Sequence, residues 1–284
     1  MKLAIETYAI REKVGDEQAI RHIKAAGFDG IDYSFYYTPD DSPITGAGYL
    51  EHAKAVRACL DEVGLACHQA HAPFRFVWGE TMDESEPHYL EIVRAIEAAA
   101  VLGAEQIVIH SIRPPKEQDT VDYNLKWYRS FEPYCKKYGI RVAVENLFMR
   151  DKKRGCFKGR FATPETLCEI VRLLDSPYFV ACIDVGHAAL TGMEPEDFIA
   201  GMERGVLKAL HIQDTDYRDD RHVLPYMADL NWDGIMSALR GIGYDGELTF
   251  EIFHFLERVP TALLPETLRY AAAVGRHLIG KFEE

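Results

Sequence analysis

The chain alternates short apolar runs with longer amphipathic segments from one end to the other. Eight runs are rich in Val, Ile and Leu and gather polar residues at their C-terminal ends, a pattern typical of strands buried on both faces of a parallel sheet. These runs are Leu3–Thr7, Gly30–Ser34, Ala66–Ala72, Gln106–Ser111, Arg141–Leu147, Val180–Val185, Leu207–Asp214 and Leu248–Ile252. Segments with helical periodicity follow them: Glu17–Ala26, Tyr49–Val63, Glu84–Leu102, Val121–Tyr138, Pro164–Leu174, Pro195–Met202, Trp232–Leu239 and Thr261–Ile279.

Residues that favour helix ends flank these segments. Glycine, which readily adopts the left-handed conformation that closes a helix, follows five of them at Gly27, Gly64, Gly103, Gly139 and Gly243. Thr163 and Pro164 provide an N-cap followed by proline in the first turn. The flanking residues therefore support the predicted helices.

Eight β-then-α units in strict alternation predict an α/β protein, because such units form a parallel sheet and eight of them close a barrel. We expect a single (β/α)8 TIM barrel spanning residues 1–284 as one domain, since no linker-like change of composition interrupts the chain. An open doubly wound sheet is the competing architecture. It rarely needs eight evenly spaced units, and no G-x-G-x-x-G follows the first strand.

Composition narrows the class of protein. With 48% hydrophobic and 27% charged residues, the chain can bury a substantial core. Its 32 basic and 45 acidic residues give a net charge of −13, which disfavours nucleic acid as a partner. The six cysteines lie far apart without a C-x-x-C pair, and we find neither a signal peptide nor an apolar stretch of spanning length. We therefore expect a cytoplasmic protein with reduced, mostly buried thiols and no membrane partner.

The predicted strand ends carry acids and imidazoles. In a parallel barrel, residues at the C-terminal ends of the strands converge on one mouth whatever their separation in sequence. The residues expected there are His71, His110, Glu145, Asp184, His187, His211, Asp220, His222 and Glu251. Several carboxylates buried in one cavity require a compensating cation.

Four of these residues lie near the C-terminal ends of the last four predicted strands: Glu145, Asp184, His211 and Glu251. Three carboxylates and one imidazole suit one divalent metal ion, with Mn²⁺ preferred and Mg²⁺, Co²⁺ and Zn²⁺ as alternatives. A single acid at a strand end is more often a cap or an ion-pair partner, and a histidine can be a hydrogen-bonded core residue. Independent caps would not be expected at four consecutive strand ends, so the set favours a metal site.

Two further features lie near the predicted mouth. The stretch 150–160 holds six cationic residues in an acidic protein. It could form a lid that holds an anionic group such as phosphate, but a solvated loop paired with the acidic surface is the simpler interpretation, which we favour. Phe74, Phe76 and Trp78 could form an apolar wall against a sugar ring or simply pack within their loop.

Short motifs follow in order along nearly the whole chain: Ala26-Gly-Phe-Asp-Gly-Ile-Asp32, His71-Ala-Pro73, Glu145-Asn146, Asp184-Val-Gly-His187, His211-Ile-Gln-Asp214, Asp220-Arg-His222, Asn231-Trp232 and Glu251. In this order and spacing they resemble the xylose isomerase-like barrel superfamily, in the sugar phosphate isomerase/epimerase branch that includes D-tagatose 3-epimerase-type enzymes. The resemblance implies a sugar or sugar phosphate isomerase or epimerase that acts on a ketose or related polyol carbonyl compound.

The resemblance also implies roles for individual residues. Glu145, Asp184, His211 and Glu251 match the metal ligands of the ketose 3-epimerases, and the two glutamates match the acid–base pair. His187 matches a substrate contact, while His71, His110, Asp220 and His222 are expected to bind substrate or support the ligands. In such chemistry a metal stabilises the enediolate formed when one carboxylate removes a carbon-bound proton and another returns a proton.

Two departures from the ketose epimerases bear on the substrate. This chain has Tyr217 where they carry an arginine after the strand-seven histidine, and Pro225-Tyr-Met-Ala replaces their Pro-Gly-x-Gly. Which sugar is bound, and whether it is phosphorylated, therefore stays open. The expected partner is a small-molecule sugar, and related barrels suggest a homodimer or homotetramer.

Two rival functions share the fold. Endonuclease-IV-type AP endonucleases are distantly similar and hold three zinc ions with ligands that all nine residues of the predicted mouth match, so a zinc-dependent phosphodiesterase is an alternative. The net charge of −13 and the absence of Gly-Glu-Gly after the last loop histidine speak against it. An inosose-type dehydratase, a lyase, would use the same first proton abstraction.

Overall fold

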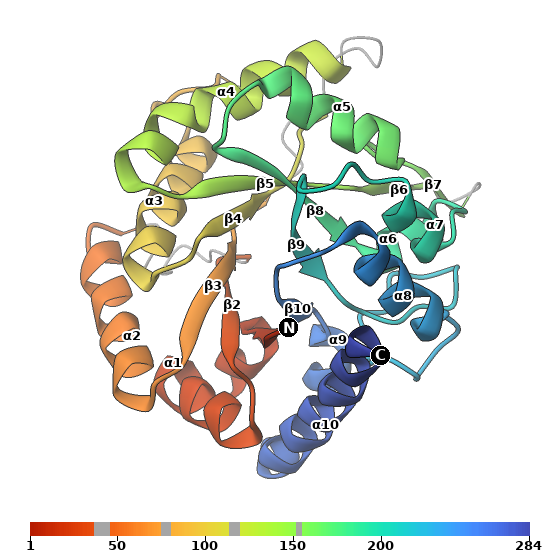
Figure 1. The fold of residues 1–284 in the computed structure, drawn as a ribbon. Helices are drawn as coiled ribbons and strands as arrows, with labels where there is room; N and C mark the ends of the chain where they lie inside the picture. Colours follow the sequence, from red (N-terminus) through yellow and green to blue (C-terminus); the bar gives the residue numbers. More distant parts are fainter. Residues whose placement is uncertain (37–45, 75–80, 114–119, 152–154) are drawn as a thin grey trace.

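Eight parallel strands form a nearly closed barrel with helices around it in the computed structural model (Figure 1). The structure describes residues 1–36, 46–74, 81–113, 120–151 and 155–284. The barrel strands are β1 (Leu3–Glu6), β2 (Gly30–Ser34), β3 (Ala66–His71), β4 (Gln106–Ile109), β5 (Arg141–Glu145), β8 (Phe179–Asp184), β9 (Leu207–His211) and β10 (Leu248–Phe250).

Hydrogen-bonded neighbours run in the order β10-β1-β2-β3-β4-β5-β8-β9, so strands that follow one another as β-then-α units lie side by side. At the remaining seam, Ile212 directly after β9 forms a parallel bridge with Phe250 of β10. All eight predicted strands are present, and the predicted barrel architecture is confirmed.

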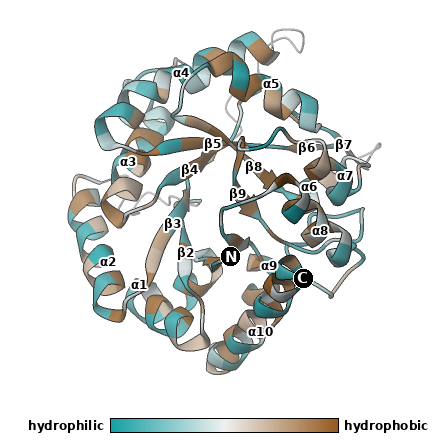
Figure 2. Cartoon of the chain, in the orientation of Figure 1, coloured by the Kyte–Doolittle hydropathy of each residue, from teal (hydrophilic) through white to brown (hydrophobic). Residues whose placement is uncertain are grey.

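The outer layer contains α1 (Tyr8–Ala26), α2 (Tyr49–Val63), α3 (Pro87–Leu102), α4 (Thr120–Tyr138), α5 (Pro164–Leu174), α7 (Pro195–Ala200), α8 (Trp232–Ile242) and α10 (Leu264–Glu283). The predicted start of the first helix at Glu17 was wrong, because α1 begins at Tyr8 and bends at Gly15, whose φ of 75° and ψ of 169° are not helical. That bend breaks the periodicity from which the start was inferred. Figure 2 shows hydrophobic residues along the strands and mixed faces on the helices, as a helix between core and solvent requires.

Small apolar side chains fill the barrel interior. Val108, Ala143, Val180, Cys182 and Ala209 form a buried cluster of their own. Ala143 is paired in register with both Val108 and Val180, and Cys182 with Ala209, so these side chains point to the same face of neighbouring strands. They form a layer inside the barrel, separate from the larger core between strands and helices.

Shorter elements cover the carboxyl end of the barrel. They are the antiparallel hairpin of β6 (Phe148–Asp151) and β7 (Gly155–Lys158), α6 (Val185–Leu190), α9 (Phe253–Glu257) and the 3-10 helix η2 (Thr261–Leu263). The stretch 150–160, expected as a loop, is therefore largely part of a hairpin. Its residues 152–154, and Phe76 and Trp78 of the predicted aromatic wall, lie outside the described residues.

Two predictions from composition can be compared with the structure. All six cysteines are free, and four of them are buried. Within the ranges given above, no helix has both the length and the apolar character that a membrane crossing requires.

Candidate metal centre

Four side chains meet where the last four barrel strands end. Glu145, Asp184 and His211 are the final residues of β5, β8 and β9, and Glu251 directly follows β10. Each offers one ligand atom, and these atoms all lie within 4.8 Å of one another. At most 3% of any of the four residues is exposed. The parallel arrangement thus brings together the four residues for which the sequence predicts a common site.

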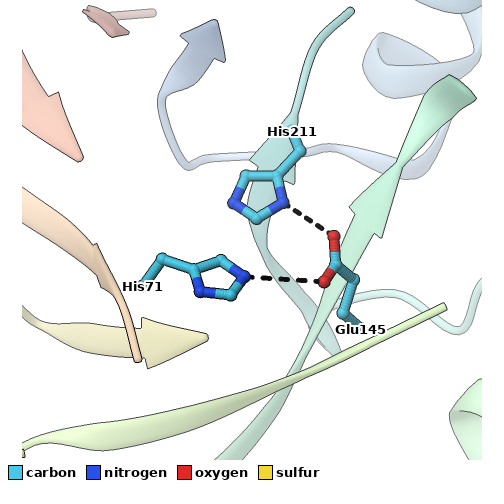
Figure 3. Close-up of side chains that lie close together, drawn as sticks. All are labelled: His71, Glu145 and His211. Atoms are coloured by element: carbon cyan, nitrogen blue, oxygen red, sulfur yellow. Dashed lines mark hydrogen bonds and ion pairs between the residues drawn. The ribbon is translucent and has the colours of Figure 1, made fainter. Parts of the chain in front are cut away.

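His211 lies at the centre of this group. Its Nδ1 is 2.7 Å from Glu145 Oε1 and 3.5 Å from Glu251 Oε2, while its Nε2 faces Asp32 Oδ2 at 3.3 Å (Figure 3 shows the Glu145 contact). Burial lowers the pKa of His211, but the neighbouring Cys182, Glu145 and Asp32 outweigh it and raise the pKa well above its usual value. Nδ1 therefore points into the carboxylate group, and Nε2 points at the Asp32 carboxylate behind it.

Two histidines flank the other oxygen of Glu145. Glu145 Oε2 lies 2.8 Å from His110 Nε2 and 3.9 Å from His71 Nε2, and the two ring nitrogens are 3.1 Å apart. The Nδ1 of His71 is 2.8 Å from the backbone oxygen of Ala72, so a proton on Nδ1 leaves Nε2 as a lone pair toward Glu145. His71 and His110 are thus part of the same polar cluster and do not pack elsewhere in the core.

A second group of ionisable side chains lies on the other side of Asp184. His187 Nε2 is 3.8 Å from both Asp184 Oδ2 and Asp220 Oδ2, and His222 Nε2 is 3.1 Å from Asp220 Oδ2. Burial lowers the pKa of His187, but Asp184 and Asp220 outweigh it and raise the pKa to about 10. All nine residues predicted for the mouth therefore lie in one connected cluster.

Four residues of this region were absent from the predicted site: Glu6, Asp32, Asn146 and Gln213. Gln213 donates to Asp184 at 3.2 Å and to Asp220 at 2.8 Å, and so connects the two groups. It follows His211 by two positions, a spacing that places side chains on the same face of a strand and could have revealed it. Glu6 ends β1, and burial, with the nearby charge of Asp32, raises its pKa to about 8.

Asn146 fixes the separation of two strand ends. Its Oδ1 accepts from the backbone N–H of Asp184 at 2.8 Å, and its Nδ2 donates to the backbone oxygen of Asp184 at 3.0 Å. These bonds continue the pairing of β5 with β8 beyond Glu145. The side chain of Asn146 thus helps to position the carboxylates of Glu145 and Asp184.

The two glutamates of the centre have opposite electrostatic environments. Burial raises the pKa of Glu145, but His211 and His110 outweigh it and hold the pKa well below its usual value. Burial, then the charges of Glu6 and Asp32, raise the pKa of Glu251 well above its usual value. In the ion-free protein the surroundings thus favour the charged form of Glu145 and the neutral form of Glu251.

A cavity of about 720 Å³ opens above this centre. Aromatic rings cover its histidines: Phe74 lies 4.6 Å from His110 and Phe253 4.1 Å from His222 between ring centroids. Phe74 of the predicted aromatic wall thus lines the cavity. Arg150 and Arg160 also line the cavity. Arg150 forms an ion pair with Asp219, as expected for a solvated loop. Its position at the cavity also agrees with the alternative, a segment that binds an anionic group.

The centre fits a divalent cation. Among the described residues, Glu145 Oε2 is a buried carboxylate oxygen that accepts no hydrogen bond of normal geometry. Three carboxylates with one imidazole match the ligand preference of hard to intermediate divalent ions. Glu145, Asp184, His211 and Glu251 are the residues that would hold such an ion. Two further groups share ligands with them, His71–Glu145–His211 and Asp184–His187–His222.

Comparison with known sequences identifies relatives over most of the chain. The family model described as xylose isomerase-like TIM barrel matches residues 20–274. An uncharacterized protein of Methanocaldococcus jannaschii is 29% identical over 191 residues, a match that spans 64% of this chain and only 62% of that protein. An uncharacterized protein of Sinorhizobium fredii is 28% identical over 276 residues, covering 83% of this chain and 81% of the relative.

Solved structures share the fold at low identity. A D-tagatose 3-epimerase-like protein is 23% identical with a TM-score of 0.69, covering 98% of this chain and 100% of the other. D-psicose 3-epimerase, solved in the presence of D-fructose, is 16% identical with a TM-score of 0.74 and coverage of 99% and 100%. The IOLI protein with a bound zinc atom is 16% identical with a TM-score of 0.77 and coverage of 99% of each chain. These likenesses show the shared fold, and the family match over residues 20–274 establishes that the chain belongs to the xylose isomerase-like TIM barrel family.

Proposed function

We propose that this protein is a divalent-metal-dependent isomerase or epimerase of a ketose or related polyol carbonyl compound, acting through an enediolate. One observation carries the proposal. Glu145 and Glu251 both approach His211, with their ligand atoms and that of Asp184 within 4.8 Å of one another. Two carboxylates beside one cation are what proton removal and return at a carbon next to a carbonyl require.

The ligand set favours Mn²⁺, with Mg²⁺, Co²⁺ and Zn²⁺ as alternatives. When bound, the cation would polarise the substrate carbonyl and offset the negative charge that develops on its oxygen. Asp184 and His211 are assigned as ligands only. The Asp32 carboxylate lies 3.3 Å from His211 Nε2 and favours the proton there, which keeps Nδ1 free to bind.

Glu145 and Glu251 are assigned as the acid–base pair in addition to their role as ligands. Their opposite pKa shifts favour one as proton acceptor and the other as proton donor at the same pH. Return of the proton to the opposite face of the same carbon gives an epimer, and return to the neighbouring carbon gives an isomer. His187, His222 and Asp220, with His71 and His110, are assigned to the substrate hydroxyls or to support of the ligands.

The relatives support this class of reaction without fixing the substrate. Proteins of similar structure include D-psicose 3-epimerase and 3-keto-D-glucoside 4-epimerase, at 16% and 19% identity. A small-molecule sugar as substrate, a single domain over residues 1–284, a cytoplasmic location and a homodimer or homotetramer remain predictions.

Hydrogen exchange at carbon tests the proposal. The purified protein is incubated in deuterated water with a panel of ketoses, ketose phosphates and inososes, and incorporation of deuterium is followed by NMR. Exchange is expected with at least one compound and is expected to fall by about 10²-fold or more in Glu251→Gln. Glu247→Gln, the same change at the opposite end of the barrel, is the control. Unchanged exchange in Glu251→Gln would reject the assigned role. Loss of water from an inosose would identify a dehydratase instead.

A zinc-dependent phosphodiesterase is the second candidate, because one observation favours it. The two flanking groups, His71–Glu145–His211 and Asp184–His187–His222, each bring three ligand atoms within 4.8 Å, which is compatible with more than one ion. Cleavage of abasic-site DNA at enzymatic rates, without exchange on any sugar of the panel, would establish this alternative in place of the isomerase.

A further inference from the structure

Three arginines line the cavity above the candidate metal centre, and Arg113 and Arg160 are two of them. Arg113 follows β4 and Arg160 follows the β6–β7 hairpin, and both face the cavity. Burial, and then the nearby charge of Arg113, lower the pKa of Arg160. Both side chains also line the same cavity, where a bound anion would be attracted by two positive charges.

Arg160 is held in a fixed orientation. Its Nε donates to Ser111 Oγ at 2.7 Å and its Nη2 to the backbone oxygen of Ser111 at 3.0 Å, while neither bond uses Nη1. Its own backbone oxygen accepts from the N–H of Leu147 at 3.0 Å, two positions after Glu145. A guanidinium fixed in this way loses little conformational freedom when it binds a ligand.

Ser111 also fixes the position of the Arg160 guanidinium group. It directly follows His110, whose Nε2 is 2.8 Å from Glu145 Oε2. The anchored side chain of Arg160 thus belongs to the part of the cavity next to the candidate metal ligands.

No carboxylate pairs with Arg160 among the residues that the structure describes, although the protein as a whole carries an excess of acids. Arg150 differs, because it lines the same cavity but pairs with Asp219. Removing a cation from bulk water without giving it an anion is unfavourable. Among the described residues, the bonds of Arg160 to Ser111 use Nε and Nη2, which leaves Nη1 for a ligand.

We propose that the substrate of this cavity carries an anionic oxygen group, a phosphate or a carboxylate, which Arg160 binds beside Arg113. The planar fork of a guanidinium matches the oxygens of either group. The inference rests on the proposed function in that it names the class of sugar derivative the isomerase would accept, namely a sugar phosphate or a sugar acid. For Arg160, the last residue of the stretch 150–160, the inference replaces the interpretation as a solvated loop that we favoured from the sequence.

Binding of inorganic phosphate and of acetate to the purified full-length protein tests the proposal by isothermal titration calorimetry. Arg160→Gln removes the charge and keeps an amide that can donate to Ser111. Its affinity for the preferred anion is expected to fall at least about tenfold. Arg150→Gln, the matched control in the same cavity, is expected to change the affinity less than about threefold. Preference for phosphate indicates a phosphate ester, and preference for acetate indicates a sugar acid.

If Arg160→Gln and the wild type bind the preferred anion with equal affinity, the proposal is overturned, because the anion then binds without Arg160. If Arg160→Gln fails to fold, Arg160→Lys keeps the charge without the fork and is expected to bind more weakly than the wild type. A wild-type melting temperature that neither phosphate nor acetate raises over chloride at equal ionic strength would also overturn it. Because these measurements need no turnover, Arg160-dependent binding without sugar exchange would reject the isomerase and leave this inference standing.

Discussion

The carboxylate behind the candidate metal ligand His211 gives a sharp test of the site. Asp32 is fully buried, and its Oδ2 faces His211 Nε2 at 3.3 Å while accepting from Gln69 Nε2 at 2.6 Å. When a cation is bound, a carboxylate in this position favours the proton on Nε2 and leaves the lone pair of Nδ1 for the cation. Asp32→Asn keeps the shape of the side chain but removes its charge.

The expected loss follows from this geometry. The amide introduced by Asp32→Asn can still offer one oxygen to His211, so the ring should keep its place. That amide no longer carries the negative charge that raises the basicity of the imidazole. Loss of such a supporting carboxylate typically costs about 10- to 100-fold in metal affinity, or about 1.4 to 2.7 kcal/mol. The fold should be retained, because Gln69 can bond to an amide as well.

Titration of the ion-free variants with Mn²⁺ measures the effect, by calorimetry or by the paramagnetic relaxation of water protons. Asp29→Asn is the matched control: Asp29 precedes the same strand but pairs with Arg276 at 2.8 Å, away from the centre. We expect a weaker Mn²⁺ affinity in Asp32→Asn only. Equal affinities in both variants and the wild type would refute His211 as a ligand supported by Asp32.

Three further substitutions test the fold, all by denaturant unfolding. Burial, then the charge of Glu105, raise the pKa of Glu247 to about 7, so the stability present below its ordinary pKa is lost as pH rises through 7. Glu247→Gln should therefore match the wild type only below pH 4.5 and exceed it by about 2 kcal/mol at pH 8, allowing for partial exposure. Equal stability at pH 8 would contradict this. Gly275→Ala would place Cβ 2.4 Å from Leu3 Cδ1. The resulting overpacking should cost about 1–3 kcal/mol of unfolding free energy, more than the gain in helix propensity, so this variant should be less stable than the wild type. Gly280→Ala in the same helix meets nothing within 4 Å and should stabilise by about 0.5–1 kcal/mol; a stabilised Gly275→Ala would show that Leu3 yields.

Most of the barrel could be predicted because its signals are local. Buried parallel strands need apolar runs, and each helix end with left-handed glycine, as at Gly27 and Gly64, is set by residues within one turn. The start of α1 could not be predicted in the same way, since Gly15 interrupts the periodicity while packing keeps the two halves together. The β6–β7 hairpin was hidden because its charged residues resemble those of a solvated loop.

The candidate ligands could be predicted because barrel topology converts strand ends into neighbours. His211 and Glu251 are far apart in sequence, yet no distance information was needed to bring them together. What the sequence could not reveal was the support around them. Asp32 acts through a contact with His211 across strands, and nothing in its local sequence distinguishes it from a residue that caps or pairs. Gln213 could have been inferred from its spacing to His211, but not its bonds to Asp184 and Asp220.

The most direct test of the central claim is a crystal structure of the protein loaded with Mn²⁺, with anomalous diffraction used to locate the ions. The account predicts one strong anomalous peak among Glu145, Asp184, His211 and Glu251, together with about one Mn²⁺ per chain by elemental analysis. A loaded crystal with no ion bound by these four residues would contradict the account. Three ions, the second beside His71 and the third beside His187 and His222, would contradict the single-metal isomerase in favour of the phosphodiesterase.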